Sequence, residues 1–545
     1  MNKKFVLSLA LVALAMTAKA QTHQEGMEYY EAGQYDNAKE LLERNLNNSG
    51  TDKSISYYYQ GLIALDENKK TEAAKYFNLG AEANPDYPYN YIGLGRIDLM
   101  GGTPKVAEAN FKKAESLGKK DAGVQIAIAR AYDSVDPSLY EKEITKRLEK
   151  ARKINMKDPD IYIFEGDVKA RNKDYGGAGT SYEMALNNDP NATAAYFKYA
   201  NLFSQVNPQY GIAMLQRLLQ HNPNSALGQR SLANAYYDQN QFKEAAAEYG
   251  KYVKNPNHFK QDEDRYAFLL FYGGDYQAGY DYATALLKQN PNNFTAQRYQ
   301  FMNAAQIPSM ADKLLPMAQK LYAAHLQDPK ANAMAPIDYT LIADEFSKNK
   351  DLSKDEAVDS AISVLNNGIQ AFPKNASFYK QLSMLYVDKN DMAGACKAYD
   401  GYLNNTKEPG YNDMIQAAVF AFYAGVQAKA DPAAADKFYQ QASAYTDKAA
   451  QLYPGMYRPE KIKGDIAINK GDKNAGVDYY INAIKKLESM DGDKSRYQSD
   501  AKAMYGTVTK AYLDKGDKAS AKQYAQGYLN IYPNDADFTT ILKDL

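Results

Sequence analysis

Residues 160–191 read DIYIFEGDVKARNKDYGGAGTSYEMALNNDPN, and this stretch decides the fold. Each half places apolar or small residues one helical turn apart, and the polar segment 172–174 separates the halves. Such spacing predicts one buried face of a helix. Pro190 predicts the end of the second helix, because proline has no amide hydrogen to continue it. The stretch therefore predicts two amphipathic helices joined by a short turn.

The same helix-pair pattern recurs along most of the chain. Pro190, Pro223, Pro256 and Pro291 follow one another at spacings of 33, 33 and 35 residues, and each closes a polar turn. We count about thirteen such units, with irregular ones near residues 121–158, 292–330 and 411–455. Self-similarity at a fixed period of this length is typical of helical solenoids.

This pattern resembles the tetratricopeptide repeat. In residues 160–191 the family's aromatic and small positions match Tyr162, Gly166, Ala178, Tyr182 and Ala185, with tyrosine where the family often has tryptophan. The resemblance implies an all-α fold: a tetratricopeptide-repeat solenoid of antiparallel helix pairs that forms a right-handed superhelix. It also accounts for much of the bias toward tyrosine, since the chain has 48 tyrosines and no tryptophan.

The first twenty residues have the three parts of a secretory signal peptide. Lys3 and Lys4 supply positive charge, residues 5–16 form an apolar run, and Ala18 and Ala20 fit a cleavage site. We therefore predict a signal peptide at residues 1–20 and an exported bacterial protein, cleaved near Ala20. No later apolar run reaches 18 residues, so no transmembrane segment is expected after cleavage.

Two repeat arrays are expected in the mature chain. Prolines crowd together between residues 307 and 337, where the period is weakest. We place the boundary there, with an N-terminal array at residues 21–335 and a C-terminal array at residues 336–545. Residues 536–545 are expected to form a short capping helix, which covers the last apolar face of an array.

Charge and cysteine content exclude several classes of function. The net charge is −1, and it becomes −4 when the three lysines of the leader are removed. Nucleic-acid binding is therefore not expected, and attraction to anionic lipid is also disfavoured. Cys396 is the only cysteine, so no internal disulfide can form, and no cysteine follows the leader to carry a lipid anchor. We expect a soluble protein of the periplasm or one associated with the outer membrane.

Motifs of catalysis are missing from the sequence. The four histidines are too far apart to form the helical pair of a zinc protease. No phosphate-binding glycine loop precedes a helix in a suitable setting, and no nucleophile elbow occurs. Carboxylates alternate with lysines, as on solvated helix faces. We predict that the protein is not an enzyme and uses no metal and no cofactor.

Binding along the first helices of the pairs is the remaining mode of action. The candidate partner-binding residues are Tyr196, Asn201, Arg230, Asn234 and Tyr237. Arg230 and Asn234 are four residues apart, so they project from one face of one helix. They resemble part of the carboxylate clamp of tetratricopeptide adaptors that bind chaperone tails. Phe268 stands at the equivalent of Asn234 in the next unit, which departs from that clamp and leaves a generic polar groove face as the alternative.

Neighbouring tyrosines, such as those at 57–59 and 236–237, cannot all face inward on one helix. The outward members, among them Tyr58, are candidates for contacts with protein or glycan. We therefore expect a non-enzymatic scaffold or adaptor of the cell envelope that binds other envelope proteins or peptide segments. The alternative is a glycan- or ligand-binding helical-repeat protein associated with outer-membrane uptake.

Overall fold

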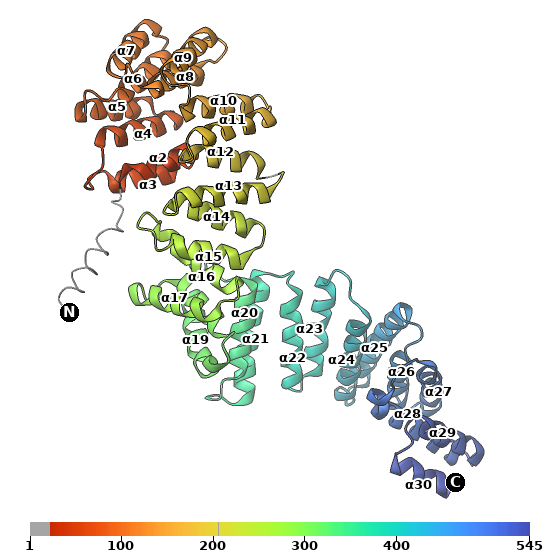
Figure 1. Ribbon diagram of the computed structural model, residues 1–545. Coiled ribbons are helices and arrows are strands. Elements are labelled where there is room, and N and C mark those ends of the chain that lie inside the picture. The colour runs from red at the N-terminus through yellow and green to blue at the C-terminus, as the bar shows by residue number, and fades with distance from the viewer. Residues whose placement is uncertain (1–21, 205) are drawn as a thin grey trace, which may run out of the picture. The chain divides into compact units, whose positions relative to one another are not determined.

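The computed structural model describes residues 22–204 and 206–545 (Figure 1). These residues form 29 α-helices, three short 3-10 helices and no strand. The predicted all-α helical-repeat solenoid is thereby confirmed. The predicted signal peptide lies outside the described residues.

The chain divides into two compact units that meet between Asn303 and Ala304. The helices of the first unit are α2 (His23–Glu31), α3 (Tyr35–Asn45), α4 (Lys53–Asp66), α5 (Lys70–Ala83), α6 (Tyr89–Met100), α7 (Pro104–Leu117), α8 (Ala122–Val135), α9 (Glu141–Ile154), α10 (Pro159–Arg171), α11 (Tyr175–Asn188), α12 (Thr193–Phe203), α13 (Pro208–His221), α14 (Ala226–Asp238), α15 (Phe242–Tyr252), η1 (Lys260–Asp262), α16 (Glu263–Tyr272), α17 (Tyr276–Gln289) and α18 (Phe294–Ala304), which ends at the boundary.

The second unit continues the same architecture. Its helices are η2 (Pro308–Met310), α19 (Ala311–Gln327), α20 (Pro336–Ser347), α21 (Lys354–Ala371), α22 (Ala376–Asp388), α23 (Met392–Asn405), α24 (Tyr411–Gln427), α25 (Pro432–Leu452), α26 (Arg458–Asn469), α27 (Lys473–Ser489), η3 (Ser495–Tyr497), α28 (Gln498–Asp514), α29 (Lys518–Ile531) and α30 (Ala536–Asp544). The boundary between repeat arrays at residue 335 stays a prediction. The boundary between the two compact units lies about thirty residues before it.

The turns inside the helix pairs share one backbone conformation. In nine of them within the described chain, the second residue after the first helix has a positive φ angle. Glycine or asparagine occupies eight of these positions, and Lys173, with φ of 64°, occupies the ninth. The left-handed conformation suits glycine and asparagine and reverses the chain in few residues. Except for α16, which packs about equally against α15 and α17, each of these first helices packs most extensively against the helix that follows it.

Close approach within the pairs depends on a glycine opposite a ring. A Cβ atom added at Gly166 of α10 would lie 2.4 Å from the ring of Tyr182 of α11. Gly61 of α4 and Phe77 of α5 have the same relation, at 2.4 Å and the same separation of 16 residues. Such distances are shorter than real Cβ contacts, so the glycine allows the ring to lie on the helix backbone. The small residues of the repeat pattern are therefore packing positions.

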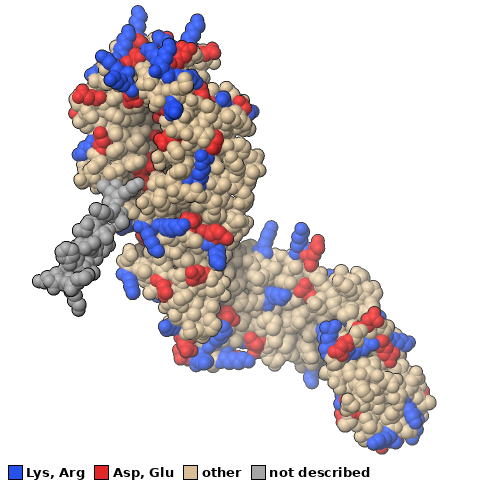
Figure 2. All heavy atoms as spheres, viewed as in Figure 1, with Lys and Arg blue, Asp and Glu red and all other residues tan. Residues whose placement is uncertain are grey.

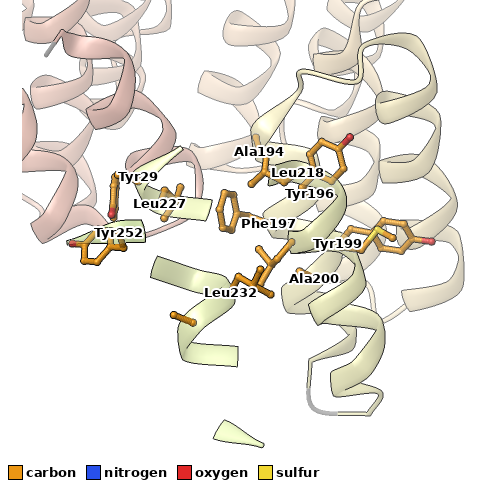
Figure 3. Close-up of a cluster of buried hydrophobic side chains, with 14 of the residues drawn as sticks. Tyr29, Ala194, Tyr196, Phe197, Tyr199, Ala200, Leu218, Leu227, Leu232 and Tyr252 are labelled. Carbon is orange, nitrogen blue, oxygen red and sulfur yellow. The ribbon is translucent and has the colours of Figure 1, made fainter. Parts of the chain in front are cut away.

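The first unit closes on itself. Helix α2 contacts not only α4 but also α12 and α14, which lie about 200 residues later (Figure 1). The ring of Tyr29 meets Phe259 edge-on at 5.5 Å, and Arg44 donates a hydrogen bond of 3.2 Å to the carbonyl of His258. Figure 3 shows Tyr29 beside Tyr252, within a core that also holds Leu227. The helix pairs of this unit thus form a closed arrangement.

The C-terminal unit has separate packing clusters along its length. At its end, Phe538 of α30 is 2% exposed and stacks on Tyr528 with ring centroids 4.1 Å apart. Residues 536–545, where a capping helix is expected, thus supply a helix that covers a buried ring. Cys396 is buried in α23, and burial raises the pKa of its thiol to about 12. This thiol is therefore a packing residue of the cluster that also holds Tyr399.

Candidate functional site

A pocket of about 270 Å³ lies between α12, α13, α14 and the turn after α2. Phe197, Ile212 and Leu215 supply apolar lining. Two of the predicted binding residues, Asn201 and Asn234, line the same pocket. They stand at equivalent places in successive repeats, so the helix stacking brings them to one side of the cavity.

The two asparagines are free to bind. Neither side-chain amide makes a hydrogen bond within the described part of the chain, and Asn201 is exposed while Asn234 is half-buried. An asparagine amide both donates and accepts hydrogen bonds, so it can pair with the N–H and C=O groups of an extended peptide. Apolar lining next to two such amides suits a peptide segment that carries an apolar side chain.

Arg230 is committed to contacts inside the protein. Its guanidinium forms an ion pair of 2.8 Å with Asp262 and donates a hydrogen bond of 3.2 Å to Gln34. It also lies over the ring of Phe259, 5.4 Å from the centroid. These contacts join α14 to η1 and to the turn after α2. The clamp hypothesis stays a prediction, and three of the five N–H groups of Arg230 already donate to Asp262 and Gln34.

The predicted aromatic residues support the wall of the site. Tyr196 is fully buried, and its hydroxyl donates to the carbonyl of Pro190 at 3.1 Å. Tyr237 is half-buried between Phe242 and Phe268, with ring centroids 5.8 Å away in both cases. The expectation that Tyr58 faces outward is wrong, because it is 8% exposed and packs among other tyrosine rings.

A charged cluster from several first helices lies near the turn after α2. Asp167 of α10 accepts ion pairs from Arg130 of α8 at 3.0 Å and from Lys198 of α12 at 2.9 Å. Glu31, the last residue of α2, accepts a hydrogen bond of 3.1 Å from the Tyr59 hydroxyl. Arg130 and Lys198 thus both pair with Asp167, and among the described residues Glu31 forms no ion pair within 4 Å.

The Glu31 carboxyl keeps its proton to a higher pH than an ordinary glutamate. Burial, followed by the negative charge of Asp160, raises the pKa of the Glu31 carboxyl to about 7, while the Tyr59 hydrogen bond opposes the rise. The folded-state pKa therefore lies above the ordinary value of 4.5. Ionised Glu31 opposes folding, and this cost grows as the pH rises from 4.5 to about 7.

The variant Glu31→Gln is accordingly expected to be more stable than the wild type at pH 8, by about 1–2 kcal/mol, with little difference at pH 4.5. Glutamine keeps the acceptor for Tyr59 and removes the charge. Thermal unfolding at the two pH values measures the difference. Glu149→Gln, on the exposed face of α9, is the control and should change neither curve. An equal effect of Glu31→Gln at both pH values would contradict the assignment.

The sequence patterns gave no hint of Glu31 or Asp160 as neighbours. They lie on α2 and α10, 129 residues apart, and only the curvature of the first unit brings them together. The one sequence signal for their proximity was that both lie on first helices of the pairs.

Among the described residues, no group of three His, Cys, Asp or Glu side chains is placed to hold a metal ion. None of the described helices has the length and apolar character needed to cross a membrane.

Stacked helix hairpins with recurring glycine–ring contacts place the chain in the class of all-α helical-repeat proteins. The model of the tetratricopeptide repeat family matches residues 23–88 and 201–258. The two matched segments are similar to tetratricopeptide repeats and cover less than a quarter of the chain, and the second includes Asn201 and Asn234 of the pocket. A comparison with curated protein sequences gave no match.

Several solved structures are similar at low identity. The C-terminal part of a TPR repeat-containing protein from Cytophaga hutchinsonii is 14% identical, with a TM-score of 0.39, over 51% of this chain and 98% of that one. Yeast Tom70 is 15% identical, with a TM-score of 0.29, over 86% and 98%. PilF of Pseudomonas aeruginosa is 17% identical, with a TM-score of 0.27, over 40% and 97%.

Proposed function

We propose that this protein is a non-enzymatic scaffold of the bacterial cell envelope, which binds an extended segment of a partner protein in the pocket between α12 and α14. One observation carries the proposal. The side-chain amides of Asn201 and Asn234 lie beside apolar pocket lining and make no hydrogen bond within the described part of the chain. Two amides one repeat apart can pair with two separate peptide groups of an extended segment. The signal-peptide pattern of residues 1–20 supports a place in the envelope.

The partner is expected to be held mainly by backbone hydrogen bonds and one apolar anchor. Buried apolar anchors supply much of the affinity at such surfaces, whereas hydrogen bonds to the backbone set the register. Arg230 and Tyr196 contribute to this site indirectly. The ion pair of Arg230 with Asp262 holds α14 in place, and the buried Tyr196, which donates to the carbonyl of Pro190, holds α12.

The double variant Asn201→Ala/Asn234→Ala should lower recovery of the partner about tenfold, since each lost amide pair weakens binding by about 0.5–1.5 kcal/mol. The measurement is crosslinking affinity purification from the native envelope, with quantitative mass spectrometry of the proteins recovered. Asn292→Ala/Asn474→Ala removes two exposed asparagines elsewhere and is the matched control.

The outcomes separate the parts of the proposal. Equal recovery by the two double variants would refute the pocket as the binding site. Recovery of no protein by the folded wild type would refute the scaffold itself and would make a glycan array the next measurement, because glycan binding is the alternative.

A further inference from the structure

Positive charge is concentrated in one part of the first unit. Residues 105–157 contain thirteen Lys and Arg but only eight Asp and Glu, although the whole chain has a net charge of −1. Figure 2 shows Lys and Arg side chains gathered over the region of α7 and α9, with fewer acidic side chains among them. The net charge of the chain, which disfavours an anionic partner, therefore conceals a local basic surface.

Two turns within this region combine lysines with exposed apolar side chains. We call residues 117–120 and 153–157 the basic tip. Its apolar members are exposed to 37% at Leu117, 37% at Ile154 and 64% at Met156. Its four lysines are also exposed, and none forms an ion pair among the described residues; they are Lys119, Lys120, Lys153 and Lys157.

The two turns lie next to each other. Glu115, near the end of α7, forms ion pairs with Arg147 at 2.5 Å and Lys150 at 2.8 Å, both on α9. The C-terminal halves of α7 and α9 are therefore side by side, and the basic tip consists of the last residues of both helices and the turns that follow them. The carboxylates that begin the next helices, Asp121 and Asp158, each accept a backbone amide hydrogen as helix caps.

We propose that the basic tip binds the anionic phospholipid surface of a membrane. Four unpaired ammonium groups attract lipid phosphates, and long lysine stems let the charges stay in the headgroup layer. Leu117, Ile154 and Met156 sit on the same turns and suit insertion at the boundary between headgroups and acyl chains. An acidic protein surface would pair with the lysines but would leave these three apolar side chains without a matching environment.

The first test uses the chain from Gln21 onward and co-sedimentation with vesicles. Vesicles of phosphatidylcholine with about 30% phosphatidylglycerol should bind the protein about 30-fold more tightly than vesicles of phosphatidylcholine alone. Neutralising the tip should remove this preference; the variant is Lys119→Gln/Lys120→Gln/Lys153→Gln/Lys157→Gln. The control removes the same charge from exposed lysines of the second unit and should retain the preference; it is Lys350→Gln/Lys354→Gln/Lys374→Gln/Lys397→Gln.

The second test reports insertion directly. Because the chain contains no tryptophan, Met156→Trp introduces a single fluorophore at the tip. Its emission should shift to shorter wavelength on adding anionic vesicles and should be quenched by brominated acyl chains. Met384→Trp, at a residue of α22 that is 52% exposed, is the matched control and should show neither effect.

Three results would overturn the proposal. They are no binding of the wild type to anionic vesicles, equal binding by the tip variant and its control, and identical responses of the two tryptophan variants. Binding of the tip to soluble polyglutamate without any binding to vesicles would assign the surface to an acidic protein. These measurements use no envelope partner, so their outcome is independent of the proposed scaffold function.

Discussion

Replacing Ala178 with aspartate is expected to lower the free energy of unfolding of the first unit by about 4–5 kcal/mol. Ala178 is fully buried in α11, in the cluster that holds Tyr182 and Ala185. A carboxylate there would lose its water without gaining a cation or a hydrogen-bond donor. Urea unfolding followed by far-ultraviolet circular dichroism measures the change.

Thr180→Asp provides the control for this variant. Thr180 lies two residues further along the same helix and is exposed, so the same side chain there should change stability by no more than about 0.5 kcal/mol. Because α11 precedes the pocket helix α12 directly, Ala178→Asp should also abolish partner recovery. Equal unfolding midpoints for the two variants would show that this face of α11 does not lie in the core.

Removing the charge of Glu115 is expected to cost about 2–4 kcal/mol at pH 7. Arg147, which is 1% exposed, depends on this carboxylate as its nearest ion-pair partner, at 2.5 Å; Glu108 is more distant at 3.6 Å. Glu115→Gln would leave the buried guanidinium poorly compensated. Thermal unfolding at pH 7, with the exposed Glu149→Gln as control, measures the loss.

The pH dependence offers an independent check of the same contact. Although burial alone would raise it, hydrogen bonds from Arg147 and Lys150 lower the pKa of Glu115 to about 2. The folded-state pKa lies below the ordinary 4.5, so the ionised carboxylate stabilises the fold above pH 4.5. This contribution is lost as the pH falls from 4.5 toward 2. The wild type and Glu115→Gln should therefore converge in stability at low pH, and a constant difference would contradict the role of the charge.

The helix pairs could be predicted from the sequence because their signals are local. Residues 160–191 contain all of α10 but its first residue, all of α11, a left-handed turn at Lys173 and the terminating Pro190. Each of these features depends on residues within one turn or one pair. The irregular unit near residues 121–158 still forms the pair α8 and α9, since helix periodicity survives where the family pattern fades.

The site was predictable only in part. Asn201 and Asn234 occupy equivalent positions in successive repeats, so local stacking brings them to one pocket. Arg230 has the same kind of position, yet its partners Asp262 and Gln34 come from a short helix after the repeat and from the first turn of the chain. Small rotations between successive pairs add up to this closure, and no single repeat contains that information.

The closure of the first unit also has a consequence for how the protein folds. Arg44 and His258 are 214 positions apart, so α2 and α3 leave the ribosome long before their packing partners exist. An open row of repeats can begin to fold at any pair and spread to its neighbours. Here the first pair gains its final contacts only after residue 262 has followed, and bringing together such distant segments slows folding. The first unit should therefore complete its folding late and in one cooperative step, after nearly half of the chain has been synthesised.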